Sequence, residues 1–365
     1  MSPVNLLPTE IEDDLRTTVR AVLRDRCDPA SVSGMYDGGP GPSDLWKTLA
    51  TELGLTGLLV PEDRGGGGAT AREAAVVMAE LGRSVAPVPF LTSAVLATTL
   101  LVEAESDLVF RLASGEHTAA IVVPLTTAPG SALPAVDAVD GKLTGEVRGV
   151  AGVIGADLLL VPVATTDGVD AYAVRSSEAG VTPVVSLDMS RQVADVVFDG
   201  AGGELVVGGS QGRTALHTAL VTGAALLAAE QVGVAQWCLQ ATITYLTQRR
   251  QFGRTVGGFQ ALKHRLADLY VEVEGAGAAA AYAVATLADG DPDAEIAAAV
   301  AQAHCSDVAV HAAEEALQLH GGIGMTWEHP LHLYLKRAKA DQIALGTAEA
   351  HRIRLADLVD LPGPR

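Results

Sequence analysis

The spacing of apolar residues changes twice along this 365-residue chain, and this change constrains the fold more than any other feature. Up to about residue 113, apolar residues recur at helical spacing, as in Ile11, Leu15, Val19 and Leu23. Between about residues 117 and 208 they form strand-length runs such as AAIVVPL and DLLLVPVA, separated by Gly, Asp and Pro. Helical spacing returns from about residue 211. The order helices, strands, helices predicts an α+β fold that is mostly α.

The charge of the chain restricts its partners. Lys+Arg number 25 and Asp+Glu 44, so the formal net charge is −19. Nucleic acids and anionic membranes attract clustered basic residues, and we therefore expect neither as a partner. A membrane span needs about 20 consecutive apolar residues. His217, Glu230 and Gln231 interrupt the candidate runs, so we expect no membrane association.

The chain ends and the cysteines indicate a cytoplasmic protein. The first residues, MSPVNLLPTEIEDDLRTTVR, carry acids where a signal peptide has basic residues. Cys27, Cys238 and Cys305 lie far apart and never in C-x-x-C spacing, which is typical of a reducing compartment. His304 and His311 flank Cys305, but their spacing matches no common set of metal ligands. We expect neither disulfides nor a metal site.

One segment is basic against this acidic background. Between Arg249 and Arg265 there are five basic residues and no acidic ones: Arg249, Arg250, Arg254, Lys263 and Arg265. Guanidinium and ammonium groups bind phosphate oxygens through charge-assisted hydrogen bonds, so the segment suits a pyrophosphate. An ordinary solvated helix end explains the charge equally well. Charge alone leaves both interpretations open.

The amino-acid sequences of this segment and of two others resemble motifs of the acyl-CoA dehydrogenase family. RRQFGRTVGGFQALKHRLADL is similar to the family's R-x-x-F-G…F-Q-x-x-K-H-x-L-A-D segment. VPEDRGGGG followed by MAELGRSVAPVPF resembles P-E-x-x-G-G-x-G…E-L-G-R, and QLHGGIGMTWEHPLHLYLKRAK resembles Q-x-x-G-G-x-G…R-x-A-K. The motifs stand in the family's order and span nearly the whole chain, so the chain is identified as a member.

The resemblance implies three domains and a cofactor. These are an N-terminal helical domain over 1–115, a middle barrel-like β-domain over 116–208 and a C-terminal four-helix bundle over 209–365. It also implies FAD bound between the second and third domains at a subunit interface. In such enzymes a carboxylate removes the α-proton of an acyl-CoA thioester while a hydride passes from the β-carbon to the flavin.

The residues that serve a neighbouring subunit's FAD in the family are present. Arg249 and Phe252 match R-x-x-F-G, and Gln318, Gly321 and Gly322 match Q-x-x-G-G. A guanidinium fits phosphate oxygens, and glycine lets the backbone approach a ligand closely. The resemblance therefore predicts these five as the cofactor-binding residues.

The residues that do the chemistry in the family are missing. The usual base is the Glu of a Y-E-G-T element, and Leu345 occupies its place in ALGT. The other position used for the base, on the helix before R-x-x-F-G, holds Gly223. Glu230 and Glu349 are the nearby alternatives, and we interpret both as structural. The resemblance thus predicts no catalytic residue in this chain.

The strand that walls the flavin ring in the family is altered too. Family members carry W-[IV]-[ST]-N there, whereas this chain has Gly149 and Ala151 in place of the Trp and the hydroxyl residue. A ring placed there would lack an aromatic wall and a hydrogen bond to its N5 edge. The chain is therefore not expected to hold a complete flavin site of its own.

Three functional hypotheses follow. The leading one is a subunit of a heteromeric (α2β2) FAD-dependent acyl-CoA dehydrogenase, whose homologous partner carries the Glu base and whose electrons pass to an electron-transfer flavoprotein. The second is a self-sufficient homomeric enzyme that uses Glu230 or Glu349. The third is a flavin-free scaffold that keeps the fold without redox chemistry.

Overall fold

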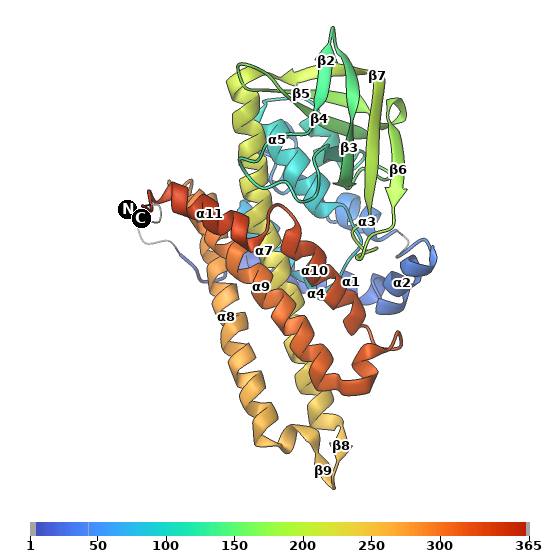
Figure 1. Ribbon diagram of the computed structural model, residues 1–365, viewed down its shortest axis with the longest axis vertical. Coiled ribbons are helices and arrows are strands. Elements are labelled where there is room, and N and C mark those ends of the chain that lie inside the picture. Colours follow the sequence, from blue (N-terminus) through green and yellow to red (C-terminus); the bar gives the residue numbers. More distant parts are fainter. Residues whose placement is uncertain (1–4, 43, 363–365) are drawn as a thin grey trace.

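The computed structural model describes residues 5–42 and 44–362; residues 1–4 and 363–365 of the expected first and third domains lie outside this range. The chain is 57% helical and 15% strand. Figure 1 shows the sheet at one end of the long axis and long helices running to the other end. The α+β, mostly α fold predicted from the spacing of apolar residues is confirmed.

The N-terminal part is helical. Its α-helices are α1 (Glu10–Arg26), α2 (Pro29–Gly34), α3 (Leu45–Lys47), α4 (Ala71–Ser84), α5 (Thr98–Glu103) and α6 (Val109–Ala113). Shorter turns of helix complete it: η1 (Met35–Asp37), η2 (Thr48–Glu52), η3 (Leu55–Gly57), η4 (Glu62–Arg64) and η5 (Phe90–Ala97). Threonine capping boxes begin the two long helices, Thr9 with Glu12 in α1 and Thr70 with Glu73 in α4.

The middle part is a seven-stranded sheet with the order β1-β4-β5-β7-β3-β2, in which β6 also pairs with β7. Only β1 and β4 pair in parallel. The strands are β1 (Ala119–Ile121), β2 (Val136–Val139), β3 (Lys142–Ala151), β4 (Leu158–Ala164), β5 (Val169–Arg175), β6 (Gly180–Val184) and β7 (Val193–Val207), with the turn η6 (Ser176–Glu178) before β6. Its interior is a separate small cluster around Leu159 and Phe198.

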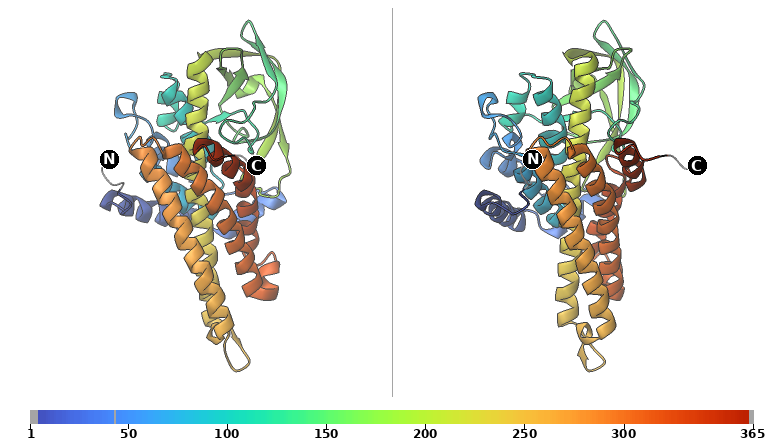
Figure 2. Two further views of the ribbon diagram at one scale, coloured as in Figure 1. Left: turned by 60° about the vertical axis from the view of Figure 1, so that its left-hand side comes forward. Right: turned by 90° about the vertical axis from the view of Figure 1, so that its left-hand side faces the viewer.

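The C-terminal part is a helical bundle. Its helices are α7 (Gly209–Gln248), α8 (Gln260–Ala288), α9 (Ala294–His320), α10 (Leu331–Ile343) and α11 (Ala348–Leu358). A hairpin of β8 (Arg250–Gln251) and β9 (Arg254–Thr255), with the turn η7 (Val256–Gly258), joins α7 to α8, and η8 (Gly321–Met325) follows α9. Figure 2 shows the hairpin projecting beyond the end of the bundle in both views.

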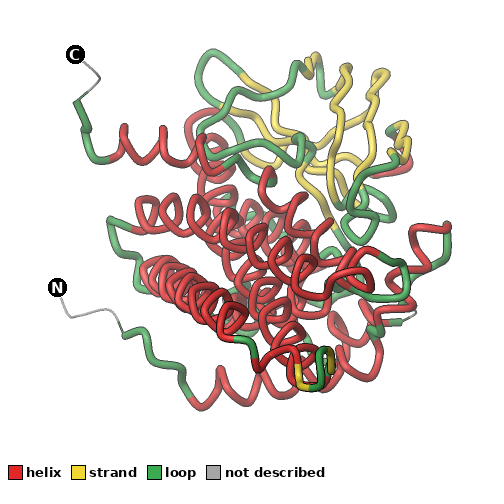
Figure 3. Tube along the Cα trace, turned by 60° about the horizontal axis from the view of Figure 1, so that its bottom comes forward, coloured by secondary structure: helices red, strands yellow, loops and turns green. Residues whose placement is uncertain are grey.

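Helix α7 is the common core of the molecule, because α4, α5, α8, α9 and α10 all pack against it. It is long and apolar enough to cross a membrane, but 94% of its most apolar window is buried inside the protein, as in a core helix. Figure 3 shows the strands of the seven-stranded sheet gathered on one side, while the helices and the small hairpin fill the rest. The chain leaves the helices between α6 and β1 and returns between β7 and α7. We therefore propose the domain boundaries expected from the sequence.

Candidate functional site

Four of the five predicted cofactor-binding residues line one cavity of about 590 Å³ at the hairpin end of the bundle. We call it the tip cavity. Arg249 enters it from the end of α7, while Gln318, Gly321 and Gly322 come from the end of α9 and the start of η8. Its other lining residues are Tyr245, Gln251, Val256, Leu319, His320 and Ile323. The structure thus brings together segments about 70 residues apart in the sequence.

The fifth predicted residue, Phe252, lies beyond the cavity at the turn of the hairpin. The α7 helix ends where the Arg249 N–H donates to the Tyr245 carbonyl oxygen at 2.8 Å, and the Val256 N–H returns to the Arg249 carbonyl oxygen at 2.8 Å. Phe252 adopts a positive φ of 53° and is 88% exposed. Exposure of a phenyl ring to this extent is costly in water, so its position fits contact with another molecule better than the chain's own core.

The glycine turn leaves room beside the cavity. Gly321 has a φ of 62°, where a side chain would be strained, and a Cβ atom at Gly321 or Gly322 would meet nothing within 4 Å. Neither glycine is therefore required by packing inside this chain. Open space above backbone that is free of side chains is what the close approach of a ligand needs.

The basic segment is divided among three roles. Arg265 is used within the chain, because its Nη2 lies 2.6 Å from the Glu315 carboxylate. The Arg254 guanidinium lies 3.8 Å from the centre of the Phe259 ring. Of the five basic residues, all of which the structure describes, Arg249 alone lines the tip cavity. The charge of the segment as a whole therefore overstates its share in the site.

The tip cavity fits the pyrophosphate and adenosine half of FAD. It offers a guanidinium for phosphate oxygens, a carboxamide at Gln318 and exposed backbone at the glycine turn. This chain does not also enclose the flavin ring system there, because Phe252 projects past the cavity. These residues would hold only part of the cofactor.

The two family base positions meet at one point in the interior, far from this cavity. A Cβ atom at Gly223 of α7 would lie 2.4 Å from Leu96 Cδ2 and 3.0 Å from Leu345 Cδ1. Leu96 and Leu345 are 7% and 2% exposed. Leucine side chains therefore fill the place where the resemblance puts the carboxylate, and they offer no proton acceptor.

The chain segments around Leu345 are joined directly by backbone hydrogen bonds. The Leu345 N–H donates to the Leu125 carbonyl oxygen at 2.8 Å, and the Leu125 N–H donates to the Gly149 carbonyl oxygen at 2.9 Å. A Cβ atom at Gly346 would lie 2.6 Å from Ala128 Cβ. We call Leu125, Gly149, Gly223, Leu345 and Gly346 the closed region. Its backbone hydrogen bonds link three parts of the chain that would otherwise flank a ligand.

The flavin ring does not fit the closed region. Gly149 has a φ of 66°, which disfavours a bulky side chain there, and Ala151 is 6% exposed with only a methyl group to offer. A Cβ atom at Gly149 would meet nothing within 4 Å, so no neighbouring group of this chain fills the place of the missing Trp. We propose that this chain lacks a complete ring site of its own.

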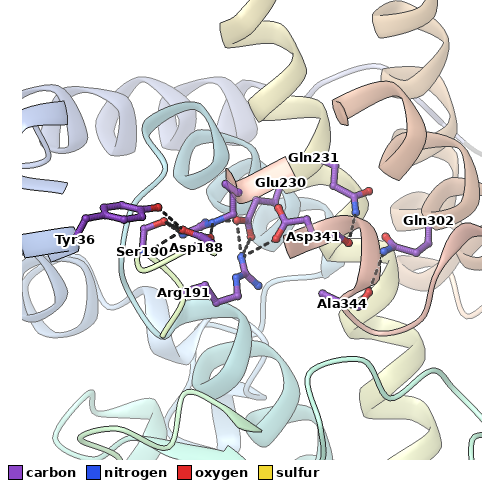
Figure 4. Close-up of polar contacts among 10 residues, drawn as sticks. Tyr36, Asp188, Ser190, Arg191, Glu230, Gln231, Gln302, Asp341 and Ala344 are labelled. Carbon is purple, nitrogen blue, oxygen red and sulfur yellow. Dashed lines mark hydrogen bonds and ion pairs between the residues drawn. The ribbon is translucent and has the colours of Figure 1, made fainter. Parts of the chain in front are cut away.

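Glu230 lies in a buried ionic cluster and is not free to act as a base. Its carboxylate accepts hydrogen bonds from Arg191 Nη2 at 2.5 and 2.7 Å and also from Arg337 Nη1. Burial acts to raise its pKa, but the charges and hydrogen bonds of Arg191 and Arg337 outweigh burial and hold the pKa below its ordinary value. Figure 4 shows the cluster, which joins α7, α10 and the loop before β7.

The cluster extends in both directions from Glu230. Arg337 Nε donates to Asp188 Oδ2 at 2.6 Å, and Tyr36 Oη donates to Asp188 Oδ1 at 3.3 Å (Figure 4). Burial, together with the charge of Glu230, raises the pKa of Asp341 well above its ordinary value. The cluster therefore ties all three parts of the molecule together. Sequence reasoning missed it, although Arg337 stands in the quoted R-x-A-K motif.

The remaining alternatives are equally unsuited to catalysis in this chain. Glu349 lies exposed in the first turn of α11, on the surface and outside the closed region. Within residues 5–42 and 44–362, no three His, Cys, Asp or Glu side chains are grouped so that they could hold a metal ion. Cys27, Cys238 and Cys305 are buried and unpaired.

Comparisons with known proteins agree with the motifs. The family models "Acyl-CoA dehydrogenase, N-terminal domain" and "Acyl-CoA dehydrogenase, C-terminal domain" match residues 9–107 and 210–359. The acyl-CoA dehydrogenase IpdE2 of Mycobacterium tuberculosis is 35% identical over 334 residues, which cover 91% of this chain and 92% of that relative.

Two solved structures share the fold across the whole chain. A chain of the ChsE4-ChsE5 complex from Mycobacterium tuberculosis aligns with a TM-score of 0.85 and 27% identity, covering 99% of this chain and 100% of that one. A chain of a variant of the Tcur3481-Tcur3483 steroid ACAD aligns with a TM-score of 0.85 and 28% identity, covering 96% and 98%. Together with both matched domains, these similarities show that the chain belongs to the acyl-CoA dehydrogenase family of FAD-dependent oxidoreductases.

Proposed function

We propose that this chain is the base-lacking subunit of a heteromeric acyl-CoA dehydrogenase. It contributes Arg249, Phe252, Gln318 and the turn at Gly321 and Gly322 to FAD held mainly by a homologous partner subunit, which carries the catalytic Glu. The substrate is an acyl-CoA thioester, the electrons pass to an electron-transfer flavoprotein, and the complex works in the cytoplasm.

The observation that carries the proposal is the separation of the two halves of the flavin site. Gly223 and Arg249 stand 26 residues apart on or just after one continuous helix (249 − 223 = 26). At about 1.5 Å per residue this is roughly 39 Å, longer than an extended flavin nucleotide. One cofactor cannot reach both, and only the tip cavity suits its share. We therefore infer that the ring half lies in another subunit, and leucine at this chain's own base position favours a different chain there.

Each residue of this chain has a stated part in the proposal. When bound, FAD supplies the acceptor for the hydride that leaves the β-carbon of the thioester. Arg249 neutralises the pyrophosphate, Gln318 provides donor and acceptor for the adenosine half, and the glycine turn admits the ligand close to the backbone. Phe252 contacts the adenine and pyrophosphate half of the FAD from the turn of the hairpin and covers apolar surface of the partner beside it. The ring and the base lie in the partner.

Similarity to heteromeric relatives supports the assembly. The ChsE4-ChsE5 and Tcur3481-Tcur3483 structures are named as pairs of different chains, and the second is described as a steroid dehydrogenase. We therefore propose an assembly of two different chains in which the partner's pocket binds the acyl group.

A homomeric enzyme using Glu230 or Glu349 is the competing proposal, and the geometry speaks against it. Glu230 would have to leave two guanidinium groups before it could accept a proton. Glu349 would have to reach the closed region from the surface of α11. Glu230→Gln and Glu349→Gln in the active complex should therefore leave the α-proton transfer in place, provided the fold survives.

The test is co-purification followed by native mass spectrometry. The chain is expressed alone and together with homologous acyl-CoA dehydrogenase chains that carry the Glu, and the FAD content of each product is measured. We expect a four-chain complex with two FAD molecules. A yellow, active assembly of this chain alone would overturn the proposal, and a stable complex without flavin would favour a scaffold role.

A further inference from the structure

His320 is buried in the wall of the tip cavity between two other rings. It lines the cavity and is 3% exposed. The Tyr245 ring stacks on it with centres 4.4 Å apart and planes 20° apart, and the half-buried His329 ring lies against it at 4.6 Å. The stack joins the last turn of α7 to the last turn of α9, and both of these rings line the same cavity as Arg249 and Gln318.

The hydrogen bonds of His320 determine which of its nitrogens can meet a ligand. Nδ1 lies 2.7 Å from the Ala316 carbonyl oxygen, which can only accept, so Nδ1 carries the proton. Burial lowers the pKa of His320, so the ring is neutral near pH 7 and Nε2 carries a lone pair. Nε2 is enclosed but has no hydrogen-bond partner within the described chain.

An enclosed acceptor without a donor is unfavourable, and a side chain chosen for packing alone would avoid it. Phenylalanine would stack on Tyr245 equally well and would leave no lone pair unsatisfied. The unsatisfied Nε2 can therefore accept a hydrogen bond from a donor outside this chain, either water or a ligand. His329 covers the ring edge from a half-buried position in the loop after η8.

The other polar groups of the cavity narrow down that donor. Arg249 can only donate and suits the pyrophosphate, which at neutral pH has no proton to give. FAD also carries hydroxyl donors on its ribityl chain, but the proposed function places the flavin half in the partner. The donors left near this cavity are the adenine amino group and the ribose hydroxyls of the adenosine half. The chemistry that Nε2 lacks is thus present next to the chemistry that Arg249 binds.

We propose that His320 is a specificity-determining residue of the tip cavity, whose Nε2 accepts a hydrogen bond from the adenosine half of the shared FAD. Tyr245 is its positioning residue, because the stacked rings fix the orientation of the imidazole. This inference rests on the proposed function. It adds recognition of the nucleoside to the recognition of phosphate by Arg249.

The test measures the dissociation constant of FAD from the heteromeric complex, using apoprotein titrated with FAD by flavin fluorescence. His320→Phe keeps a ring on Tyr245 but removes the acceptor, and we expect about fivefold to tenfold weaker binding, the value of one hydrogen bond. Tyr270→Phe, at an exposed ring of α8 that does not line the cavity, is the control and should bind FAD as the wild type does. Thermal unfolding of each complex without FAD shows whether a loss of affinity comes from misfolding.

FAD analogues distinguish the two possible donors. One has hypoxanthine in place of adenine and lacks the amino group; the others lack the 2′- or 3′-hydroxyl of the adenosine ribose. We expect one of them to bind the wild type about fivefold to tenfold more weakly than FAD, and the His320→Phe variant not to discriminate against it. The analogue that shows this identifies the donor.

Two outcomes overturn the inference. One is equal FAD affinity for wild type and His320→Phe while Arg249→Ala weakens binding. The other is a His320→Phe variant that loses the same factor toward FAD and every analogue, which would mean that the ring only packs. If Arg249→Ala also leaves FAD binding unchanged, it is the proposed function that has failed.

Discussion

The tip cavity and the closed region of this one fold differ in packing: the first is open and the second is filled. At the tip, Gly321 and Gly322 face open space and Phe252 is 88% exposed, so these residues make few contacts within this chain. In the closed region, Leu96 and Leu345 fill the place of the base and backbone hydrogen bonds link Leu345 to Leu125. One region is incomplete without a second molecule, and the other is complete without a ligand.

The difference teaches how a fold can lose catalysis and keep its role in an assembly. A closed site gains buried apolar contacts and satisfied backbone groups, so its loss of function carries a gain in packing. An exposed ligand site gains nothing on its own and persists only where a neighbour needs it. The pattern of filled and open positions therefore supports the proposal that the partner subunit does the chemistry.

The largest expected effect comes from forcing a carboxylate into the closed region. Leu345→Glu restores the family's residue at a position that is 2% exposed and surrounded by Leu96 and the α7 backbone at Gly223. An unpaired buried carboxylate costs several kcal/mol, so the free energy of unfolding should fall by about that amount. Urea unfolding followed by circular dichroism measures it.

Leu345→Met is the matched control, since a swap that conserves volume should cost less than about 1.5 kcal/mol. If the Leu345→Glu variant is as stable as the control, the region has room for a charged group and its solvent, and it is not closed. A gain of bound flavin in the variant chain alone would contradict the comparison still more strongly.

The next effect is expected at the tip cavity. Arg249→Ala removes the guanidinium that faces the pyrophosphate, and a hydrogen bond to a charged group contributes about 1.5–3 kcal/mol. FAD affinity of the heteromeric complex should therefore fall by roughly 10- to 150-fold, while the stability of this chain changes little. Titration of the apo complex with FAD measures the loss.

Arg250→Ala is the control for charge, because Arg250 is exposed on the same hairpin and does not line the cavity. It should lower affinity only through weak long-range attraction, which salt screens. Equal losses for the two variants would assign the effect to the net charge of the hairpin and not to a site at Arg249.

Acid should act on His332 and on the buried ionic cluster at different pH values. Burial, with the charges of Lys336 and His329, lowers the pKa of His332 from 6.5 to about 4. The unfolded chain therefore binds a proton between pH 6.5 and about 4 that the folded chain does not, and stability falls as the pH drops through that range. Asp188 and Glu230 have lowered pKa values, so their stabilisation is lost only as the pH falls below their ordinary values of 3.8 and 4.5.

The first of these losses of stability is measured by unfolding the protein at each pH and following the fluorescence of Trp327, whose ring lies 4.6 Å from His332. His332→Phe keeps a ring against Trp327 and removes the titrating group. Because the site is half-buried and partly screened by solvent, the change should amount to about 1 kcal/mol at pH 5. An unchanged pH profile in the variant would show that His332 does not titrate in this range.

The sequence was sufficient for most of the fold. The change from helical spacing to strand-length runs located the sheet, whose strands run from β1 (Ala119–Ile121) to β7 (Val193–Val207). Glu230, Arg191 and Arg337 show where it was insufficient. Their mutual contacts depend on how α7, α10 and the loop before β7 pack, and no local pattern encodes that packing.

The same limit applies to the sites. Leu345 and Gly223 could be recognised as replacing a base one position at a time, but only packing reveals that they touch each other and Leu96. Arg249 could be identified by its motif, whereas His320 could not, because a histidine before two glycines has many uses. Its unpartnered Nε2 becomes visible only when the ends of α7 and α9 lie side by side.

The smallest expected effect on the chain itself belongs to Phe252. Phe252→Ser replaces a ring that is 88% exposed and whose nearest aromatic neighbour is Phe259, with ring centres 6.2 Å apart. Surface substitutions of this kind change the free energy of unfolding by about 0.5 kcal/mol or less. In the heteromeric complex the same change should weaken subunit association severalfold, because burying the ring there removes apolar surface from water.

Urea unfolding of this chain measures the first of these two effects, and a concentration series of the complex in analytical ultracentrifugation measures the second. Equal and negligible changes in both would mean that Phe252 faces solvent in the assembly, and the tip would then lose its apolar contact with the partner.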